Sequence, residues 1–242
     1  MAGKITWGNE FILELRRQDL YPVLSEFWAS DATGIDTTIW ATALAGAGTV
    51  TRTITTSSPM RVTLSTIDAL AASTARLTSR ILFRASPSNY TTSFTPKRFT
   101  IQWEARFTTI TAFDNTTFFM GLADTTTSTR ATNNLIGFGL TTDALRQVTD
   151  NAGTESETTP STVPTLTNWN EYRIEITRLG TTNTIQFFIN DIVIATHNTA
   201  ANIPDINAYL TFFVDNDTTG IAVLDVGAIT SRYFDLNLGN FE

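Results

Sequence analysis

The sequence predicts an all-β protein, an antiparallel β-sandwich preceded by an N-terminal arm. Three observations support this: apolar and polar residues alternate with a period of two, turn residues separate the alternating segments, and threonine makes up about a fifth of the chain. β-Branched side chains such as threonine favour a pleated, half-buried surface. Hydrophobic residues amount to 42% of the 242 residues and include 16 phenylalanines, so a substantial core can form. This length fits one large β domain.

The chain divides into an arm, residues 1–25, and a body, residues 26–242. The arm places large apolar side chains outside the sandwich pattern, and residues 11–15 fit a strand by alternation and a helix by composition. We expect the arm to be an attachment element that packs on a neighbouring subunit or another protein. The alternative is an edge strand that pairs with its own domain. The candidate attachment residues are Trp7, Phe11, Leu13, Leu15 and Tyr21.

Within the body, period-two segments predict the strands of the sandwich. The clearest is residues 98–110, where one face consists of Phe99, Ile101, Trp103, Ala105 and Phe107. Residues 170–179 repeat this scheme, with Tyr172, Ile174 and Ile176 on the apolar face. Further strands are expected at residues 116–123, 135–140, 208–214 and 221–229. Residues 66–80 are expected to supply one short helix or turn.

Residues 184–196 predict a β-hairpin that turns at Asn190-Asp191. Asparagine and aspartate tolerate the positive φ angles that a two-residue hairpin turn requires. The hairpin is followed directly by His197, the only histidine of the chain. Histidine titrates near neutral pH and is therefore a candidate for acid–base chemistry. No serine lies in a nucleophile-elbow pattern, so we expect His197 to be a structural residue that anchors the following loop by hydrogen bonding.

Composition and charge exclude several classes of partner and site. The net charge is −7 and the strongest basic run is Arg16-Arg17, whereas nucleic-acid binding requires clustered basic contacts. The chain contains no cysteine, so disulfides and thiolate metal sites are excluded. No apolar stretch approaches the length of about 18 residues that a transmembrane helix needs, and the first residues do not resemble a signal peptide. We expect no cofactor, no membrane contact and synthesis in a cytoplasm.

Two stretches resemble a known family. Residues 187–204 (FFINDIVIATHNTAANIP), followed by residues 209–234, resemble the C-terminal half of concanavalin A-like jelly-roll domains, including members among the virion proteins of tailed bacteriophages. Upstream, Ile35, Asp36 and Trp40 match the entry segment of that superfamily. The resemblance covers roughly residues 25–235 and implies two curved antiparallel sheets, one of them concave.

Glucanases of this superfamily carry catalytic carboxylates on a concave-face strand, typically as Glu-x-Asp-x-x-Glu, and this sequence contains no Glu-x-Asp. Glu171 and Glu175 share a strand face, but four residues of strand separate them by roughly 13 Å, with Arg173 between them. Retaining glycosidases need about 5–5.5 Å. We interpret these residues as a charge ladder and treat Glu104 with Arg106 in the same way. The strand motifs of the alginate-lyase branch are also missing, so we expect no enzyme activity and no catalytic residue.

The sequence also offers candidates for a cation site and for a glycan-binding site. Asp215 and Asp217 offer oxygen ligands to a cation, but the spacing lacks the closing acidic residue of a calcium loop, so we expect a turn and no metal site. Exposed aromatic side chains can stack on sugar rings. The candidates for glycan stacking are Trp169, Tyr172 and Tyr209, whereas Trp103 lies on the apolar face and is expected in the core.

Three classes of function follow from this sequence. The first is a non-enzymatic structural virion protein, a capsid decoration (cement) protein or a fibre or tail component, that acts through contacts with other virion proteins as a homo-oligomer. The second is a glycan-binding module for receptor recognition. The third is a glycoside hydrolase or polysaccharide lyase of the same fold. The absent catalytic motif, the apolar arm and the resemblance to virion proteins favour the first, with the virion as the location.

Overall fold

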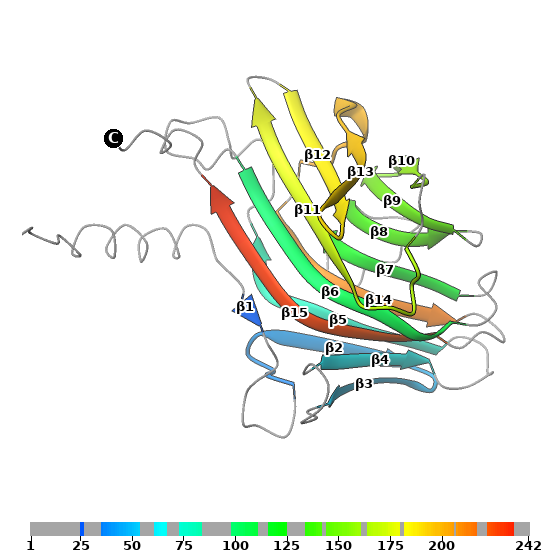
Figure 1. Ribbon diagram of the computed structural model, residues 1–242. Helices are drawn as coiled ribbons and strands as arrows, with labels where there is room; N and C mark the ends of the chain where they lie inside the picture. The colour runs from blue at the N-terminus through cyan, green and yellow to red at the C-terminus, as the bar shows by residue number, and fades with distance from the viewer. Residues whose placement is uncertain are drawn as a thin grey trace, which may run out of the picture.

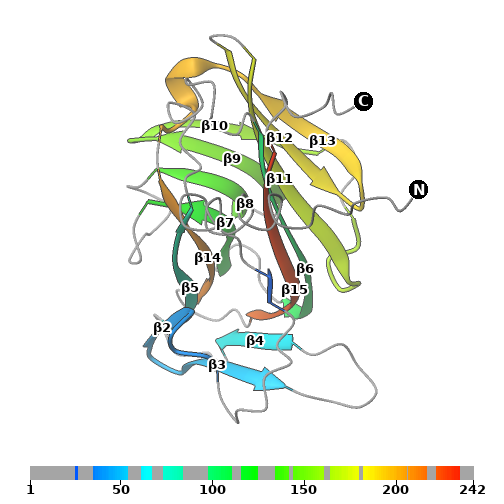
Figure 2. The same cartoon turned by 90° about the vertical axis from the view of Figure 1, so that its left-hand side faces the viewer.

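A computed structural model of the protein describes residues 25–26, 35–53, 61–66, 73–83, 98–110, 116–124, 134–141, 144–160, 164–179, 182–205, 207–216 and 222–234. Strands in these segments form two antiparallel sheets that lie face to face (Figures 1 and 2). The only helical element among the described residues is the short 3-10 turn η3 (Ala200–Asn202). The predicted antiparallel β-sandwich is confirmed.

The first sheet, sheet A, has eight strands, of which β1 (Ser25–Glu26) pairs with β15 beside the main path. In spatial order, the path consists of β13 (Ile192–His197), β12 (Thr182–Ile189), β11 (Asn170–Leu179), β6 (Arg98–Ile110), β15 (Ala222–Phe234), β4 (Arg61–Thr66) and β3 (Gly48–Thr53). The long strands β6 and β15 are neighbours, although more than a hundred residues separate them in the chain. The topology therefore brings distant segments together at the centre of sheet A.

The second sheet, sheet B, has seven strands. In spatial order they are β10 (Thr154–Thr158), β9 (Ala144–Asn151), β8 (Leu135–Thr141), β7 (Thr116–Ala123), β14 (Ala208–Asn216), β5 (Ser73–Phe83) and β2 (Trp40–Ala45). Four of the strands that were expected from the sequence, at residues 116–123, 135–140, 208–214 and 221–229, correspond to β7, β8, β14 and β15. Apolar and aromatic runs between turn residues located these strands. Residues 118–123 of β7 and 135–139 of β8 are all buried, so both faces of these two strands are covered.

The core lies between the two sheets and consists of the apolar faces that the sequence predicted. Phe99, Ile101, Trp103, Ala105 and Phe107 of β6 are all buried, as are Tyr172, Ile174 and Ile176 of β11. Trp103 stands at the contact of the sheets: its ring lies 5.9 Å from Phe138 of β8 and 5.7 Å from Phe212 of β14, both edge-on. The expectation that Trp103 is a core residue is confirmed.

The prediction of a short helix or turn at residues 66–80 is wrong for the described part of that segment, because strand β5 begins at Ser73. β5 is an interior strand of sheet B that pairs with β14 on one side and with the edge strand β2 on the other. Ala75 and Leu77 are fully buried within it. Alanine and leucine favour a helix locally, but burial in the sheet and pairing along both edges outweigh that preference.

The predicted hairpin of β12 and β13 is confirmed, and its turn is tied to the neighbouring strand. Asn190 and Asp191 have φ angles of 51° and 63°, as a hairpin turn with two left-handed residues requires. The Asn190 side chain accepts a hydrogen bond from the Glu171 backbone N–H at 2.9 Å, and its amide group donates to Asn170 Oδ1 at 2.9 Å. These bonds fix the turn against the start of β11.

The arm lies almost entirely outside the described residues. The attachment candidates Trp7, Phe11, Leu13, Leu15 and Tyr21 all fall there, so their role stays a prediction. At the boundary expected between arm and body, Ser25 and Glu26 pair with Thr230 and Ile229 of β15. In the segments that the structure describes, no helix is long and apolar enough to cross a membrane.

Candidate functional site

The outer face of sheet A presents an ordered array of polar side chains on three neighbouring strands. Strands β6 and β11 pair so that Glu104 lies opposite Glu171, Gln102 opposite Arg173 and Thr100 opposite Glu175. On the other side of β6, Thr230 and Arg232 of β15 lie opposite Gln102 and Thr100. Because the alternate residues of these strands form the core, the polar residues between them all project outward.

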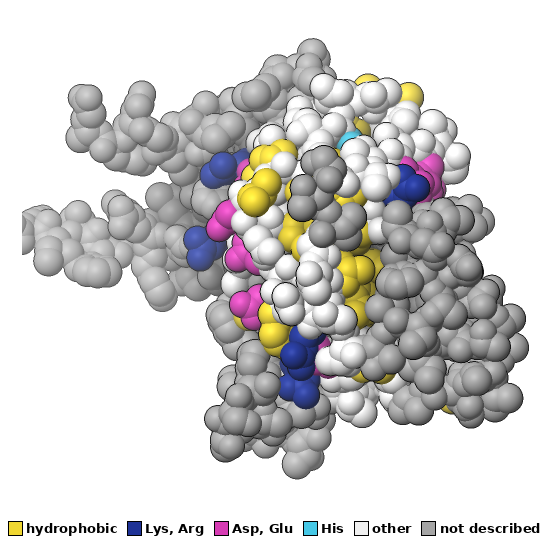
Figure 3. Space-filling view, turned by 45° about the vertical axis from the view of Figure 1, so that its right-hand side comes forward, with side chains coloured by type: hydrophobic (Ala, Val, Ile, Leu, Met, Phe, Trp, Pro, Cys, Tyr) yellow, Lys and Arg dark blue, Asp and Glu magenta, His cyan; other side chains and the backbone are white. Residues whose placement is uncertain are grey.

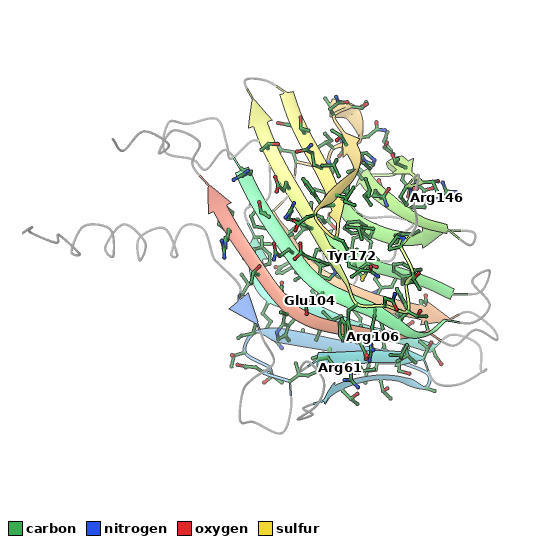
Figure 4. All side chains as sticks on the ribbon, viewed as in Figure 1. Arg61, Glu104, Arg106, Arg146 and Tyr172 are labelled. Atoms are coloured by element: carbon green, nitrogen blue, oxygen red, sulfur yellow. The ribbon has the colours of Figure 1, made fainter. Side chains whose placement is uncertain are left out.

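At one end of this array, Trp169 lies beside the facing carboxylates Glu104 and Glu171. Trp169 is half-buried, and the Arg106 guanidinium lies 4.9 Å from the centre of its ring. A Cβ atom at Gly227 would lie 2.9 Å from Glu104 Oε2 and 3.3 Å from the Trp169 ring, so both side chains approach the backbone closely here. Gly227 belongs to an irregular step of β15 between Val226 and Ile229. We call Trp169, Glu104 and Glu171 the Trp169 platform; Figure 4 labels Glu104 and Arg106.

The loop that carries Trp169 is held firmly at the end of β6. The Phe107 backbone N–H donates to the Leu166 carbonyl at 2.8 Å, which ties the loop to that strand. The Asn170 side chain is buried and donates to the carbonyls of Thr165 and Asn168 at 3.0 and 2.9 Å. Trp169 therefore stands on a preorganised loop, which reduces the entropy cost of binding a ligand.

The facing pair of Glu104 and Glu171 was missed by sequence reasoning, which compared only carboxylates on one strand. The pair depends on the register between β6 and β11, and no local pattern contains that register. Partial burial, the neighbouring carboxylate of Asp191 and that of Glu104 together raise the pKa of Glu171, although Arg173 acts in the opposite direction. Glu104 is exposed on the open face. Like charges directly opposite each other in a sheet cost stability, which is reason to seek a functional role for this pair.

Arg173 occupies the centre of the array and joins its acidic residues. Its guanidinium lies 2.7 Å from Asp191, 3.3 Å from Glu175 and 3.9 Å from Glu171. Glu175 also lies 3.8 Å from Arg98. These contacts match the interpretation of Glu171 and Glu175 as members of a charge ladder. Figure 3 shows basic and acidic side chains next to one another on one face of the molecule.

Beyond Arg173 the outer face forms a shallow groove of about 240 Å³. We call it the basic groove, because three arginines and only one carboxylate line it. Its lining residues are Arg98, Thr100, Gln102, Arg173, Glu175, Thr230 and Arg232. The groove and the Trp169 platform share the strands β6 and β11, and the positions from Arg98 to Glu104 span about 20 Å along β6. One extended ligand is therefore able to contact both.

A third polar cluster, around Asp225 of β15, is structural. Asp225 is 1% exposed, lies 3.1 Å from the Nε atoms of both Arg61 and Arg106, and accepts a hydrogen bond of 2.6 Å from the Thr63 hydroxyl. The cluster joins β4, β15 and β6 at the lower end of sheet A, where Figure 4 labels Arg61 and Arg106. It holds Arg106, and thereby the ring of Trp169, in place.

His197 is structural, but the predicted loop-anchor geometry is wrong. It is the last residue of β13, it is 6% exposed, and its two ring nitrogens each lie 2.9 Å from a threonine hydroxyl, those of Thr149 and Thr158 in sheet B. Its ring also stands edge-on to Phe187 at 5.1 Å. His197 therefore joins sheet A to sheet B by these contacts and does not anchor the loop that follows it. Burial lowers the pKa of the imidazole, which favours the neutral ring.

We expect the stability of the protein to fall as the pH drops below about 6.5, the pKa of a histidine in an unfolded chain. Because the folded-state pKa of His197 is lowered, the unfolded state binds the proton more readily. This contribution to stability is complete above the unfolded pKa and is lost as the pH falls, by at most about 1.4 kcal/mol per pH unit. Urea unfolding at pH 7.5 and 5.5 measures this difference in the free energy of unfolding. In the control variant His197→Gln the difference between the two pH values should shrink; an equal difference would contradict the assignment.

The structure separates the three residues predicted to stack on glycans. Tyr172 is fully buried, 6.2 Å from Trp103, so this prediction is wrong: alternation places its ring between the sheets. Burial raises the pKa of its phenol well above the usual range. Tyr209 is half-buried in β14 of sheet B, whereas Trp169 belongs to sheet A. Of the three residues, only Trp169 lies beside the polar side chains on the outer face of sheet A.

The cation site considered at Asp215 and Asp217 gains no support. Asp215 accepts a hydrogen bond of 3.0 Å from the Thr74 hydroxyl in the neighbouring strand β5, and Asp217 lies outside the described residues. Within the segments that the structure covers, no three acidic, histidine or cysteine side chains gather in a way that could hold a metal ion.

Comparison with known proteins identifies the fold. No protein-family model matches this chain, and no curated protein matches it by sequence. Among solved structures, it is similar to a β-1,3-glucanase from Mycobacterium marinum, with a TM-score of 0.57 and 10% identity over 88% of this chain and 98% of that chain. The Emp47p carbohydrate recognition domain gives a TM-score of 0.56 and 10% identity over 88% of this chain and 95% of that one.

The legume lectin-like domain from Entamoeba histolytica gives a TM-score of 0.54 and 9% identity over 81% of this chain and 90% of that one. The chain has the concanavalin A-like jelly-roll fold. At this identity the similarity concerns the fold alone, which glucanases and lectins share. The finer resemblance to phage virion proteins stays a prediction.

Proposed function

We propose that the protein is a non-enzymatic carbohydrate-binding module whose ligand lies on the outer face of sheet A. The observation that carries this proposal is the Trp169 platform, a half-exposed indole on a preorganised loop beside the carboxylates of Glu104 and Glu171. An aromatic ring stacks on the apolar face of a sugar, and carboxylates accept hydrogen bonds from its hydroxyl groups. Solved structures of the same fold include a carbohydrate recognition domain and a lectin-like domain.

Hydrolysis is the competing function, because facing carboxylates with a raised pKa on one of them resemble the pair of a retaining glycosidase. Two features favour binding instead. Glu104 is exposed on an open sheet face, whereas the general acid of a glycosidase commonly stands in a partly apolar pocket that keeps its carboxyl protonated. Arg173 contacts Glu171 and the neighbouring carboxylates in an ion-pair network. Turnover of a β-glucan that disappears in Glu104→Gln or Glu171→Gln would contradict the non-enzymatic proposal.

Trp169→Ala is expected to weaken glycan binding at least tenfold, about 1.4 kcal/mol, because a central tryptophan commonly dominates an interface. A glycan array identifies a ligand for the intact protein, and isothermal titration calorimetry then compares the variants. The matched control is Tyr209→Ala, which removes a half-buried aromatic ring from sheet B. Equal affinity of wild type and Trp169→Ala, or a loss in Tyr209→Ala alone, would place the site elsewhere.

The sequence also predicted a role in a virion. A carbohydrate-binding module could be located there, so the two proposals are compatible. The virion role rests on the apolar arm and on the sequence resemblance, and the solved structures named above do not bear on it. A search for the protein in purified particles, combined with its oligomeric state in solution, is the experiment that tests this role.

A further inference from the structure

We infer that the carbohydrate is acidic and that its carboxylate or sulfate groups bind in the basic groove. This inference rests on the proposed function and names the class of ligand. The groove adjoins the Trp169 platform along β6 and β11, and three arginines and one glutamate line it on a protein whose net charge is −7. Arg173 is also paired with Asp191 and Glu171, so the excess positive charge lies at Arg232. Such a local reversal of sign attracts an anion to this part of the face.

Within the described segments, the three arginines of the groove differ in how their charge is paired. Arg173 is held by three carboxylates, and Arg98 lies 3.8 Å from Glu175. Arg232, in contrast, is exposed, and no carboxylate of the described residues lies within ion-pair distance of it. Its guanidinium is therefore available to a ligand, and arginine binds carboxylate and sulfate groups through two parallel hydrogen bonds.

Neutral donors stand next to this charge. Thr100 lies directly opposite Arg232, and its hydroxyl oxygen is buried without a hydrogen-bond partner among the described residues. Gln102 and Thr230 add an amide and a hydroxyl to the same lining. The Gln102 amide and the Thr230 hydroxyl can donate and accept hydrogen bonds with the hydroxyl groups of a sugar bound beside Arg232.

The outer face is polarised along the length of β6. Glu104 and Glu171, with Asp191 nearby, form its acidic end, whereas Arg98 and Arg232 form its basic end. A ligand with charge on every sugar would meet repulsion at the acidic end. The arrangement therefore fits a glycan in which a neutral sugar occupies the Trp169 platform and an acidic sugar occupies the basic groove.

The experiment compares the full chain with three soluble probes of equal length: a neutral hexose oligomer, the same oligomer carrying one uronic acid, and the same oligomer carrying one sulfate. We expect at least one charged probe to bind about tenfold more tightly than the neutral one, with an affinity that falls as salt rises. Arg232→Ala should remove most of this preference, and Arg232→Lys should keep part of it. The matched control is Arg80→Ala, which removes an exposed arginine from β5 of sheet B and should change nothing.

The possible outcomes separate the two proposals. If all three probes bind equally and Trp169→Ala abolishes this binding, the inference of an acidic ligand is wrong and the proposed function stands. If a charged probe binds through Arg232 but Trp169→Ala has no effect, the groove binds anions and the platform proposal is wrong. If none of the probes binds, both are wrong. Comparison of the carboxylated with the sulfated probe identifies the anion.

Discussion

Trp103→Ala is expected to lower the free energy of unfolding by about 3–5 kcal/mol, the cost of removing a large aromatic side chain from a packed core. The indole is 1% exposed and contacts three aromatic rings, those of Phe138 and Phe212 in sheet B and Tyr172 in sheet A. Its removal leaves a cavity at the point where the sheets meet. Guanidinium unfolding followed by fluorescence or circular dichroism measures the change.

Two variants make this expectation specific. Trp103→Phe keeps an aromatic ring and removes an indole nitrogen that has no hydrogen-bond partner among the described residues, so it should cost clearly less than alanine. Trp169→Ala removes the same kind of side chain from the surface, and we expect it to cost less than about 1 kcal/mol. Equal losses in Trp103→Ala and Trp169→Ala would contradict the assignment of one tryptophan to the core and the other to a binding site.

Asp225→Ala is expected to lower the free energy of unfolding by about 3 kcal/mol, because it leaves two arginines without their shared carboxylate. The Asp225 side chain is 2% exposed and contacts Arg61 and Arg106, which are themselves largely covered. Its loss also removes the acceptor of the Thr63 hydroxyl. Urea unfolding of Asp225→Ala, Arg106→Ala and the double variant measures the effect, and the double variant should cost less than the sum of the two.

The matched control for this prediction is Asp191→Ala, which breaks another aspartate–arginine contact on the same sheet. Asp191 lies 2.7 Å from Arg173, but its side chain is 77% exposed, so we expect a loss below about 1 kcal/mol. If both alanine variants lower the free energy of unfolding by the same amount, burial does not determine the strength of these ion pairs. Loss of Trp169-dependent glycan binding in Asp225→Ala would show in addition that the cluster positions Arg106 and the ring above it.

Some parts of the fold were predictable because they depend on neighbours in the chain. Alternation assigned Phe99, Trp103 and Phe107 to the core, since successive side chains of a strand point to opposite faces. The same rule placed Tyr172 with Ile174, so the buried position of Tyr172 was available from the sequence and contradicted its choice as a stacking residue. The turn at Asn190-Asp191 was predictable because its backbone conformation is a local preference of those residues.

The sequence by itself thus determined which faces of the strands are apolar, where the hairpin turns and that the protein is a β-sandwich. Only the tertiary structure decided that residues 73–83 form an interior strand, that Glu104 faces Glu171, and that Arg232 lies opposite Thr100. The physical reason is that periodicity fixes the direction of each side chain, whereas the identity of its neighbours depends on strand order and register. These depend on the packing of the whole core, in which Asp225 meets an arginine 119 positions away.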